Sequence, residues 1–297
     1  MEREQWLEER RGGIGGSDAA AICGVSPWRT PLMVWEEKTG LAPKKVENEA
    51  MFWGTTLEPV IRQRYSDLTG REVKVPNEIL RHPTHNWMIG NIDGFTDEPR
   101  GLEIKTAGYP DGWGEPGTDE IPVHYIFQVQ HYLAITGFPV FDVPVLIGGR
   151  DFRIYHVYPD AELQGMIIQK EEDFYEAMVS GCPPDPVTYE DVTRLYKTSK
   201  EESVFASKEI EDLVISLRLL RKELDIFEQN EKEVKRKIME FMGNSDTLRA
   251  LDGETLVTWK YARPAQRFDA QALEKDQPDI YKQYLKSGDS SRRFLIK

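Results

Sequence analysis

The 297-residue sequence predicts a mixed α/β (α+β) fold with a helical extension, on three observations. Across residues 1–180, segments with helical periodicity alternate with short strand-like segments, which is typical of an α/β domain. A proline-rich stretch at residues 183–186 follows and indicates a linker. Beyond it, an apolar heptad pattern over residues 207–242 indicates one long helix.

Helices of the first part are expected near residues 17–23, 30–39, 55–69, 122–136 and 160–179. Thr55 or Thr56 can cap the third of these, which would place Pro59 in its first turn, where proline is tolerated. Gly137 is expected to end the fourth, because glycine readily adopts the left-handed conformation that closes a helix.

Strands are expected near residues 71–80, 87–96, 101–106 and 140–157. The last of these segments should fold into a hairpin that turns at residues 148–151, where two glycines occur. Residues 106–121 are rich in glycine and proline and form a long loop, and such loops are often functional. Trp113, at the centre of this loop, would either stack on a ligand or pin the loop to the core.

The strand at residues 101–106 carries the side chains best suited to chemistry. Apolar and charged residues alternate in it, so Glu103 and Lys105 should share one face. A hairpin with the preceding strand would bring Asp93 roughly opposite Glu103. Two carboxylates beside an ammonium suit a hard cation such as Mg²⁺. The triplet alone stays ambiguous, because Glu-x-Lys is also common on solvated strand faces.

In the long helix, Ser207 is the expected cap and Gly243 the expected end. The heptad positions are apolar except for Glu231, and they are Ile210, Leu213, Leu217, Leu220, Leu224, Phe227, Glu231, Val234, Ile238 and Phe241. This stripe predicts packing against a partner helix or another subunit, or against the preceding domain of the same chain. A hairpin turn at Asp252-Gly253, a strand at 256–261, a helix near 269–286 and a strand at 292–296 should complete the chain.

Composition excludes several classes of protein. Two cysteines are too few for a four-cysteine zinc site or iron–sulfur cluster and provide no disulfide framework, which favours a reducing cytoplasm. The sequence opens without an apolar signal segment and contains no apolar run of membrane-spanning length, so no membrane partner is expected. A GxxxxGK[ST] phosphate loop is also missing, which excludes a P-loop motor.

Five sequence motifs follow one another along residues 1–180. They are Trp6 with Arg10 and Gly12–Asp18; Gly24–Trp28; Trp53-Gly54 with Glu58; Asp93-Gly94 with Glu103-Ile104-Lys105; and Gln128 with Tyr132. As an ordered set they resemble the YqaJ-type viral recombinases, relatives of phage lambda exonuclease within the PD-(D/E)xK nuclease superfamily. Ile92 stands where the superfamily pattern has proline, but that proline binds nothing.

This resemblance implies a PD-(D/E)xK restriction-endonuclease-like core, with a mixed central sheet flanked by helices, in residues 1–185. A linker and the long amphipathic helix would follow in residues 186–246, and a small extension of a hairpin and a helix in residues 247–297. The cysteines have no place in the implied site. His131 could line the cleft, but a packed or surface role is favoured for it.

The resemblance also implies a metal site. Asp93 and Glu103 would be ligands of one or two Mg²⁺ or Mn²⁺ ions, together with the backbone carbonyl of Ile104. Glu58 would reach a second ion directly or through water. Carboxylate and carbonyl oxygens are the ligands that such ions prefer, so the residue types agree with the implied roles.

Further roles concern the reacting groups and the DNA. Lys105 would orient the attacking water, and Gln128, supported by Tyr132, would hold the nucleophile or the scissile phosphate. In the glycine-rich segment, the implied contacts to a DNA 5′-phosphate are Arg10 and Ser17, with Arg11 or Arg29 as helpers; Trp113 would be a further DNA contact. Without the other motifs, this segment would simply be a glycine-rich turn followed by a helix that Ser17 or Asp18 caps.

The implied function is a metal-dependent deoxyribonuclease, foremost a 5′→3′ exonuclease on linear double-stranded DNA in phage-type recombination. It would act in the cytoplasm of a bacterial host, as a homo-oligomer (a trimer by analogy), with a single-strand annealing protein as a possible partner. The net charge of −13 predicts weak nonspecific DNA binding. Two alternatives stand beside it. One is a structure-specific or restriction-type endonuclease, and the other is a non-catalytic DNA-binding or assembly protein that acts through the long helix.

Overall fold

The computed structural model describes residues 10–43, 48–265, 267–286, 288 and 292–297, so Trp6 of the first motif lies outside the described residues. The chain divides into two compact units, one ending at Leu195 and the other beginning at Tyr196. Because α7 (Tyr189–Leu195) belongs to the first unit, this division falls later than residue 185. The Thr30 hydroxyl donates to Asp191 of α7 at 2.7 Å, and Arg194 pairs with Glu36 at 3.2 Å.

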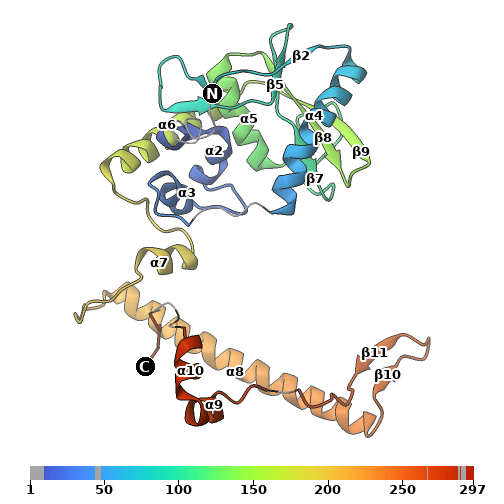
Figure 1. Cartoon of the computed structure of the whole chain (residues 1–297), viewed down its shortest axis with the longest axis vertical. Helices are drawn as coiled ribbons and strands as arrows, with labels where there is room; N and C mark the ends of the chain where they lie inside the picture. Colours follow the sequence, from blue (N-terminus) through green and yellow to red (C-terminus); the bar gives the residue numbers. More distant parts are fainter. Residues whose placement is uncertain (1–9, 44–47, 266, 287, 289–291) are drawn as a thin grey trace. The chain divides into compact units, whose positions relative to one another are not determined.

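A mixed six-stranded sheet forms the centre of the first unit (Figure 1). Its order is β2–β5–β6–β8–β7, with β9 paired to β8. The strands are β2 (Val73–Lys74), β5 (Gly94–Thr96), β6 (Arg100–Leu102), β7 (Lys105–Ala107), β8 (Val140–Ile147) and β9 (Asp151–Val157). β8 runs parallel to β6 and β7 and antiparallel to β9, and this β8–β9 hairpin confirms the one predicted within residues 140–157.

A smaller sheet joins β1 (Ile14–Gly15), β4 (Met88–Gly90) and β3 (Leu80–Arg81), with β4 in the middle. β1 pairs with β4 in parallel, which fixes the glycine-rich segment against β4. The helices of this unit, apart from α7, are α2 (Gly16–Ile22), α3 (Pro31–Lys38), α4 (Glu49–Thr69), α5 (Val123–Thr136) and α6 (Ala161–Ser180).

The two faces of β8 contact different helices, because successive side chains of a strand point to opposite faces. Phe141, Val143 and Val145 pack in one buried cluster with Val129 and Leu133 of α5. On the other face, the buried Asp142 accepts a hydrogen bond from Tyr65 of α4 at 2.5 Å. The central sheet is therefore flanked by helices.

Most predicted helices are confirmed, but the start of α4 was wrong. Asn48, not Thr55 or Thr56, caps this helix and accepts from the Met51 N–H at 2.9 Å. Pro59 consequently lies inside the helix instead of in its first turn, and Glu58 lies near its middle. A proline in a helix interior removes one hydrogen bond, so the sequence signal for a helix start was misleading here.

Several predicted strands are shorter or divided. Of residues 71–80, only the short β2 and the first residue of β3 are strands. The segment 87–96 splits into β4 and β5, which belong to different sheets. Residues 101–106 form two strands, β6 and β7, separated by Glu103 and Ile104. Both interruptions fall where the chain presents the carboxylates of the site.

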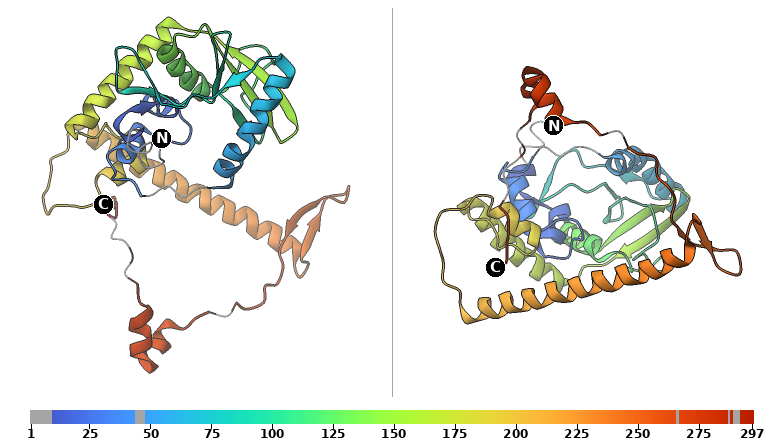
Figure 2. Two further views of the ribbon diagram at one scale, coloured as in Figure 1. Left: turned by 45° about the horizontal axis from the view of Figure 1, so that its top comes forward. Right: turned by 90° about the horizontal axis from the view of Figure 1, so that it is seen from below.

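The second unit consists of a long helix, a hairpin and two short helices. Figure 2 shows α8 (Lys208–Met242) as one unbroken helix, and the Ser207 hydroxyl accepts from the Ile210 N–H at 3.4 Å as its predicted cap. The hairpin is β10 (Thr247–Arg249) with β11 (Thr255–Thr258), and its turn contains Gly253 at φ 92°. The single helix predicted near 269–286 is two helices, α9 (Ala270–Asp276) and α10 (Pro278–Tyr284), because Pro278 starts the second. Residues 292–297, all described, form no strand, contrary to the prediction.

Among the helices that the structure describes, none combines the length and the apolarity needed to span a membrane.

Candidate active site

The β5–β6 hairpin sets Asp93 and Glu103 across from each other. Gly94 pairs with Leu102 in the antiparallel ladder, and the Asp93 N–H donates to the Leu102 carbonyl at 3.1 Å. After Leu102, the Glu103 N–H donates to the Asp142 carbonyl of β8 at 3.1 Å. The Ile104 N–H turns instead to the Asp93 carboxylate, at 2.6 Å. The predicted pairing of Asp93 and Glu103 across a hairpin is thus confirmed.

Lys105 and Gln128 close a network around one oxygen of Glu103. The Lys105 ammonium donates to Glu103 Oε1 at 2.5 Å and to Gln128 Oε1 at 3.1 Å. The Gln128 amide donates to the same Glu103 oxygen at 2.6 Å and contacts the Tyr132 hydroxyl at 3.2 Å. Gln128 and Tyr132 lie four residues apart on α5, which puts both on one helix face.

The electrostatics of this cluster are unbalanced. Burial, and then the Glu103 charge, raise the pKa of Asp93 well above its usual range. Burial also raises the pKa of Glu103. Although burial disfavours its ammonium, Lys105 has a raised pKa because Glu103 and Asp93 outweigh that effect. Of these three groups, two are carboxyls and one is an ammonium, so together they carry one excess negative charge when all three are ionised.

The second carboxylate oxygen of Glu103 indicates which ligand the Asp93–Glu103 pair could bind. Glu103 Oε2 is buried and has no hydrogen-bond partner in the part of the chain that the structure describes. An unpaired buried carboxylate oxygen is costly, so it calls for a ligand. A divalent cation fits this oxygen and the Asp93 carboxylate by charge and by donor type.

Glu58 lies at the edge of this site. It forms an ion pair with Arg62, one helical turn further along α4, and Arg62 Nε donates to the Asp93 carbonyl at 3.1 Å. After burial and Glu103, the Glu58 charge is also among the causes that raise the pKa of Asp93. Within the described ranges, no group of three or more histidine, cysteine, aspartate or glutamate side chains is close enough to hold a metal ion. Glu58 therefore stands apart from the Asp93–Glu103 pair.

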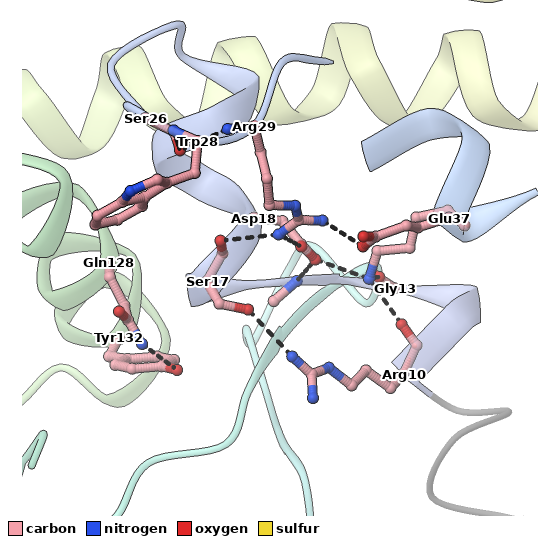
Figure 3. Close-up of polar contacts among 12 residues, drawn as sticks. Arg10, Gly13, Ser17, Asp18, Ser26, Trp28, Arg29, Glu37, Gln128 and Tyr132 are labelled. Carbon is pink, nitrogen blue, oxygen red and sulfur yellow. Dashed lines mark hydrogen bonds and ion pairs between the residues drawn. The ribbon is translucent and has the colours of Figure 1, made fainter. Parts of the chain in front are cut away.

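A pocket of about 180 Å³ joins the carboxylates to the glycine-rich segment. Its lining residues are Arg10, Gly15, Gly16, Ser17, Ile79, Ile89, Gly90, Asn91, Asp93, Glu103, Gln128 and Tyr132. Arg10 donates to the Ser17 hydroxyl at 3.2 Å (Figure 3). Arg10 and Ser17, which were expected to contact a phosphate, thus share one pocket with Asp93 and Glu103, which were expected to hold a metal. Glu58 and Ile104 are not among its lining residues.

Lys38, which the sequence did not single out, supports this segment. Lys38 donates to the carbonyls of Gly13 and Arg10 at 2.6 and 2.8 Å, and it pairs with Asp18 at 2.8 Å. Although burial opposes ionisation, Lys38 and Arg29 lower the pKa of Asp18. No sequence signal marks Lys38, whereas Arg62 could have been found from its i,i+4 spacing to Glu58.

One sequence prediction about this segment was wrong, and two others are not tested by the structure. Ser17 does not cap α2: Gly15 occupies the cap position, and Asp18 accepts its N–H at 3.2 Å. Arg29 is engaged by Asp18 at 3.1 Å and Glu37 at 2.5 Å (Figure 3), and neither Arg29 nor the exposed Arg11 lines the pocket.

Trp113 does not face the pocket either. It is only 8% exposed and packs in the core cluster, with its ring 5.2 Å from Tyr155 and 5.6 Å from Tyr125. The long loop is therefore pinned by this tryptophan, and the prediction that Trp113 contacts DNA was wrong. Its position at the centre of a glycine-rich loop suggested exposure that the tertiary packing removes.

The glycines of the segment allow close packing. A Cβ on Gly16 would lie 2.5 Å from Tyr132 Cε1, and a Cβ on Gly13 would lie 2.9 Å from the Trp87 carbonyl. These positions admit only glycine without a shift of their neighbours. They bring the backbone that carries Arg10 and Ser17 directly against α5 and β4.

A structural comparison identifies the fold. The crystal structure of an alkaline exonuclease (LHK-Exo) from Laribacter hongkongensis aligns with a TM-score of 0.50 at 24% identity, over 60% of this chain and 93% of that chain. The expected PD-(D/E)xK-type core, a mixed sheet flanked by helices, is confirmed by this likeness and by the strand order.

Sequence comparisons identify the family. Residues 5–139 match the YqaJ-like viral recombinase domain. Protein D345L of African swine fever virus (strain Badajoz 1971 Vero-adapted) is 28% identical over 113 residues, which are 35% of this chain and 32% of that protein. The uncharacterized protein YqaJ of Bacillus subtilis (strain 168) is 32% identical over 311 residues, covering 100% of this chain and 95% of that protein. Since this relative matches over the whole length, the chain belongs to the YqaJ-like viral recombinase family.

Proposed function

We propose that the protein is a metal-dependent deoxyribonuclease, and that it degrades linear double-stranded DNA from 5′ ends. The observation that carries this proposal is the convergence of Asp93, Glu103, Lys105 and Gln128 on one pocket with Arg10 and Ser17. The family and the fold shared with an alkaline exonuclease support a nuclease.

Asp93 and Glu103 would hold one or two Mg²⁺ or Mn²⁺ ions, with the Ile104 carbonyl as a further ligand and Glu58 acting through water. When bound, such an ion lowers the pKa of coordinated water and stabilises negative charge on phosphate oxygens. The orphaned Glu103 oxygen and the raised pKa values of both carboxyls support this assignment, because a cation relieves both.

Lys105 and Gln128 would act on the attacking water and the scissile phosphate. The Lys105 ammonium lies within hydrogen-bond distance of both Glu103 and Gln128, so a water beside Glu103 can be oriented by it. The Gln128 amide carries both a donor and an acceptor and is anchored by Tyr132. Positioning and charge stabilisation are the main means of catalysing phosphoryl transfer.

Arg10 and Ser17 favour an exonuclease over an endonuclease. A guanidinium and a hydroxyl suit a terminal phosphate, which carries more charge than an internal diester. An enzyme that cuts within a duplex has no need of such a subsite beside its carboxylates. The expected setting is a bacterial cytoplasm, with duplex DNA as substrate and a single-strand annealing protein as possible partner.

Three substrates test the proposal in Mg²⁺: linear duplexes with 5′-phosphate or 5′-hydroxyl ends, and closed circular DNA. We expect progressive loss of the phosphorylated linear duplex, slower loss of the hydroxyl form, intact circles, and no activity in EDTA. Lys105→Ala should abolish the activity, whereas Lys74→Ala, which removes an exposed ion pair with Asp97, should retain it.

Nicking of closed circles would support the endonuclease alternative. If no DNA is lost in Mg²⁺ or Mn²⁺, both enzymatic alternatives fail.

A further inference from the structure

Trp28 presents a large aromatic surface next to the proposed active site. Its side chain is 66% exposed, in contrast to the buried Trp35 and Trp113 of the same unit. The backbone around it is fixed, because the N–H groups of Trp28 and Arg29 donate to the Ser26 hydroxyl at 3.3 and 3.2 Å. The following Arg29 is held by Asp18 and Glu37. The exposed indole is therefore held in position for binding a ligand.

The Trp28 ring rests on α5. It meets the His124 ring edge-on, with centroids 4.7 Å apart and an interplanar angle of 79°. His124 in turn contacts Tyr125 at 4.1 Å, and the Lys105 ammonium lies 4.7 Å from the Tyr125 ring centroid. The tryptophan is therefore connected to the proposed catalytic lysine through two aromatic side chains.

The geometry of α5 orders these groups in a row. His124, Gln128 and Tyr132 follow at intervals of four residues, so they share one helix face. Gln128 and Tyr132 line the pocket, whereas His124 supports Trp28 one turn before Gln128. Figure 3 shows Trp28, Gln128 and Tyr132 on the same side of Ser17. Trp28 therefore packs against the helix face whose later turns line the pocket.

We propose that Trp28 is a stacking platform for a nucleobase of the DNA strand whose phosphate occupies the pocket. This inference rests on the proposed function, since it takes a nucleic acid as the ligand. The groups in the pocket suit a phosphate. The exposed ring, supported by the neighbouring turn of the same helix, suits a flat base. Stacking on an aromatic ring accepts any base, as an enzyme that degrades DNA irrespective of sequence requires.

The experiment measures binding without turnover. In a Lys105→Ala background with Mg²⁺, fluorescence anisotropy would follow a 5′-phosphorylated duplex and three analogues that each carry an abasic residue at one of the first three 5′ positions. We expect one abasic position to weaken binding about tenfold, the order of a single base–aromatic stack. Adding Trp28→Ala should weaken binding of the intact duplex to the same extent. In that variant the abasic residue should cause no further loss of affinity (the abasic penalty), as expected of two groups that interact with each other.

Two variants separate stacking from a structural effect. Trp28→Phe keeps an aromatic ring, so it should retain most of the affinity for the intact duplex and most of the abasic penalty. Tyr158→Ala removes an aromatic residue that is 61% exposed. It should change neither the affinity nor the abasic penalty, because Tyr158 lies beside Gln130, whose amide donates to the Tyr158 carbonyl, and not on the Gln128 face of α5. The stacking role is overturned if Trp28→Ala leaves the intact duplex bound as before, if the abasic penalty persists in that variant, or if Trp28→Phe binds as weakly as Trp28→Ala.

Failure of this inference is distinguishable from failure of the proposed function. Hydrolysis by the wild-type protein together with an unchanged abasic penalty in Trp28→Ala would reject stacking alone. A lost penalty in Trp28→Ala with no hydrolysis by the wild-type protein would reject the nuclease and keep the stacking role. Absence of DNA binding together with absence of hydrolysis by the wild-type protein would overturn both.

Discussion

Asp93 and Glu103 destabilise the folded protein when both carboxyls are ionised. Both carboxyls have raised pKa values, chiefly through burial, and they face each other across the hairpin. A group with a raised folded-state pKa binds its proton more tightly in the folded protein. Its stabilising contribution is therefore complete at low pH and is lost as the pH rises through that raised pKa. Without a metal ion, the folded protein should lose stability toward alkaline pH.

Asp93→Asn should therefore stabilise the metal-free protein at pH 8. We expect a gain of about 1 kcal/mol in the free energy of unfolding, of the size typical when a functional strain is removed, and a smaller gain at pH 5. The asparagine can still accept from the Ile104 N–H. Urea titrations in EDTA at the two pH values measure the effect.

Asp97→Asn provides the control for this substitution. Asp97 is an exposed carboxylate that pairs with Lys74, and its replacement should change stability by less than about 0.5 kcal/mol. Mg²⁺ should raise the melting temperature of the wild-type protein and of the Asp97→Asn variant, but hardly that of Asp93→Asn. A loss of stability in metal-free Asp93→Asn at pH 8 would contradict the electrostatic account.

Gly16→Ala should damage the pocket through Tyr132. The new Cβ would lie 2.5 Å from the ring, so Tyr132 and the Gln128 amide that it anchors must shift. Overpacking of this kind costs about 1–3 kcal/mol. Gly12→Ala is the matched control, since a Cβ there meets nothing within 4 Å. Thermal unfolding and DNA degradation should both be impaired in Gly16→Ala only; equal effects of the two substitutions would exclude the packing explanation.

The residues of the site differ in how well their positions could be predicted from the sequence. Asp93, Glu103 and Lys105 follow from their spacing, because a hairpin and a strand period bring them together locally. Gln128 and Tyr132 follow only from the ordered motifs, since no local rule places α5 beside that hairpin. Lys38, Trp28 and His124 meet their partners through packing of separate elements, and nothing in the sequence marks those contacts.

At the scale of elements, α5 connects the site to the rest of the fold, because its faces contact different parts of the first unit. Gln128 and Tyr132 line the pocket, Val129 and Leu133 enter the core beneath it, and His131 reaches α6 and β4. His131 lies 2.7 Å from Glu171 of α6 and 2.9 Å from the Ile89 carbonyl. Although burial disfavours the imidazolium, Glu171 and that carbonyl raise the pKa of His131. The buried pair thus fixes α5 relative to both neighbours.

Glu171→Ala should be strongly destabilising, by about 3 kcal/mol, because it leaves a buried charged ring without its partner. The loss should be largest near pH 6 and should shrink as the pH rises, since the contribution of a raised histidine pKa disappears as the pH passes through it. Glu176→Ala, an exposed position of the same helix, should cost less than about 0.5 kcal/mol. Urea unfolding at pH 6 and pH 9 measures both variants; a loss that grows with pH would refute the assignment.

The elements differ in how well the sequence predicts them. α5, α6 and the β8–β9 hairpin carry clear period and end signals, and their predicted ranges agree with the structure. The start of α4 was missed because Pro59 looked like a first-turn residue. The segments 71–80 and 87–96 were predicted as single strands, since local alternation cannot show that a chain leaves one sheet and enters another. In the latter segment, that crossing places Asn91 and Asp93 at the pocket.

At the scale of the whole molecule, the two units have different surface chemistry. The first unit contains three clusters of buried apolar side chains, whereas Met242 is the one buried residue among the described residues of α8. In α8 of the second unit, most apolar heptad residues are exposed, namely Ile210, Leu213, Leu220, Leu224, Phe227, Val234 and Phe241. A seam with this 3.5-residue spacing is typical of helices that pack as coiled coils. We therefore expect the full chain to form a homo-oligomer through α8, with a trimer as the state implied by analogy.

Leu224→Glu tests this expectation on the full chain. Leu224 lies within the stripe and is 61% exposed, and a carboxylate placed in a packed helix seam should cost about 3 kcal/mol because it is buried without a partner. Ile226→Glu introduces the same charge at a residue that is 56% exposed but lies off the heptad positions, so it should leave assembly intact. Sedimentation velocity at micromolar concentration should show an oligomer for the wild type and Ile226→Glu and a monomer for Leu224→Glu. A monomeric wild-type chain, or equal dissociation of both variants, would rule out a heptad interface on α8.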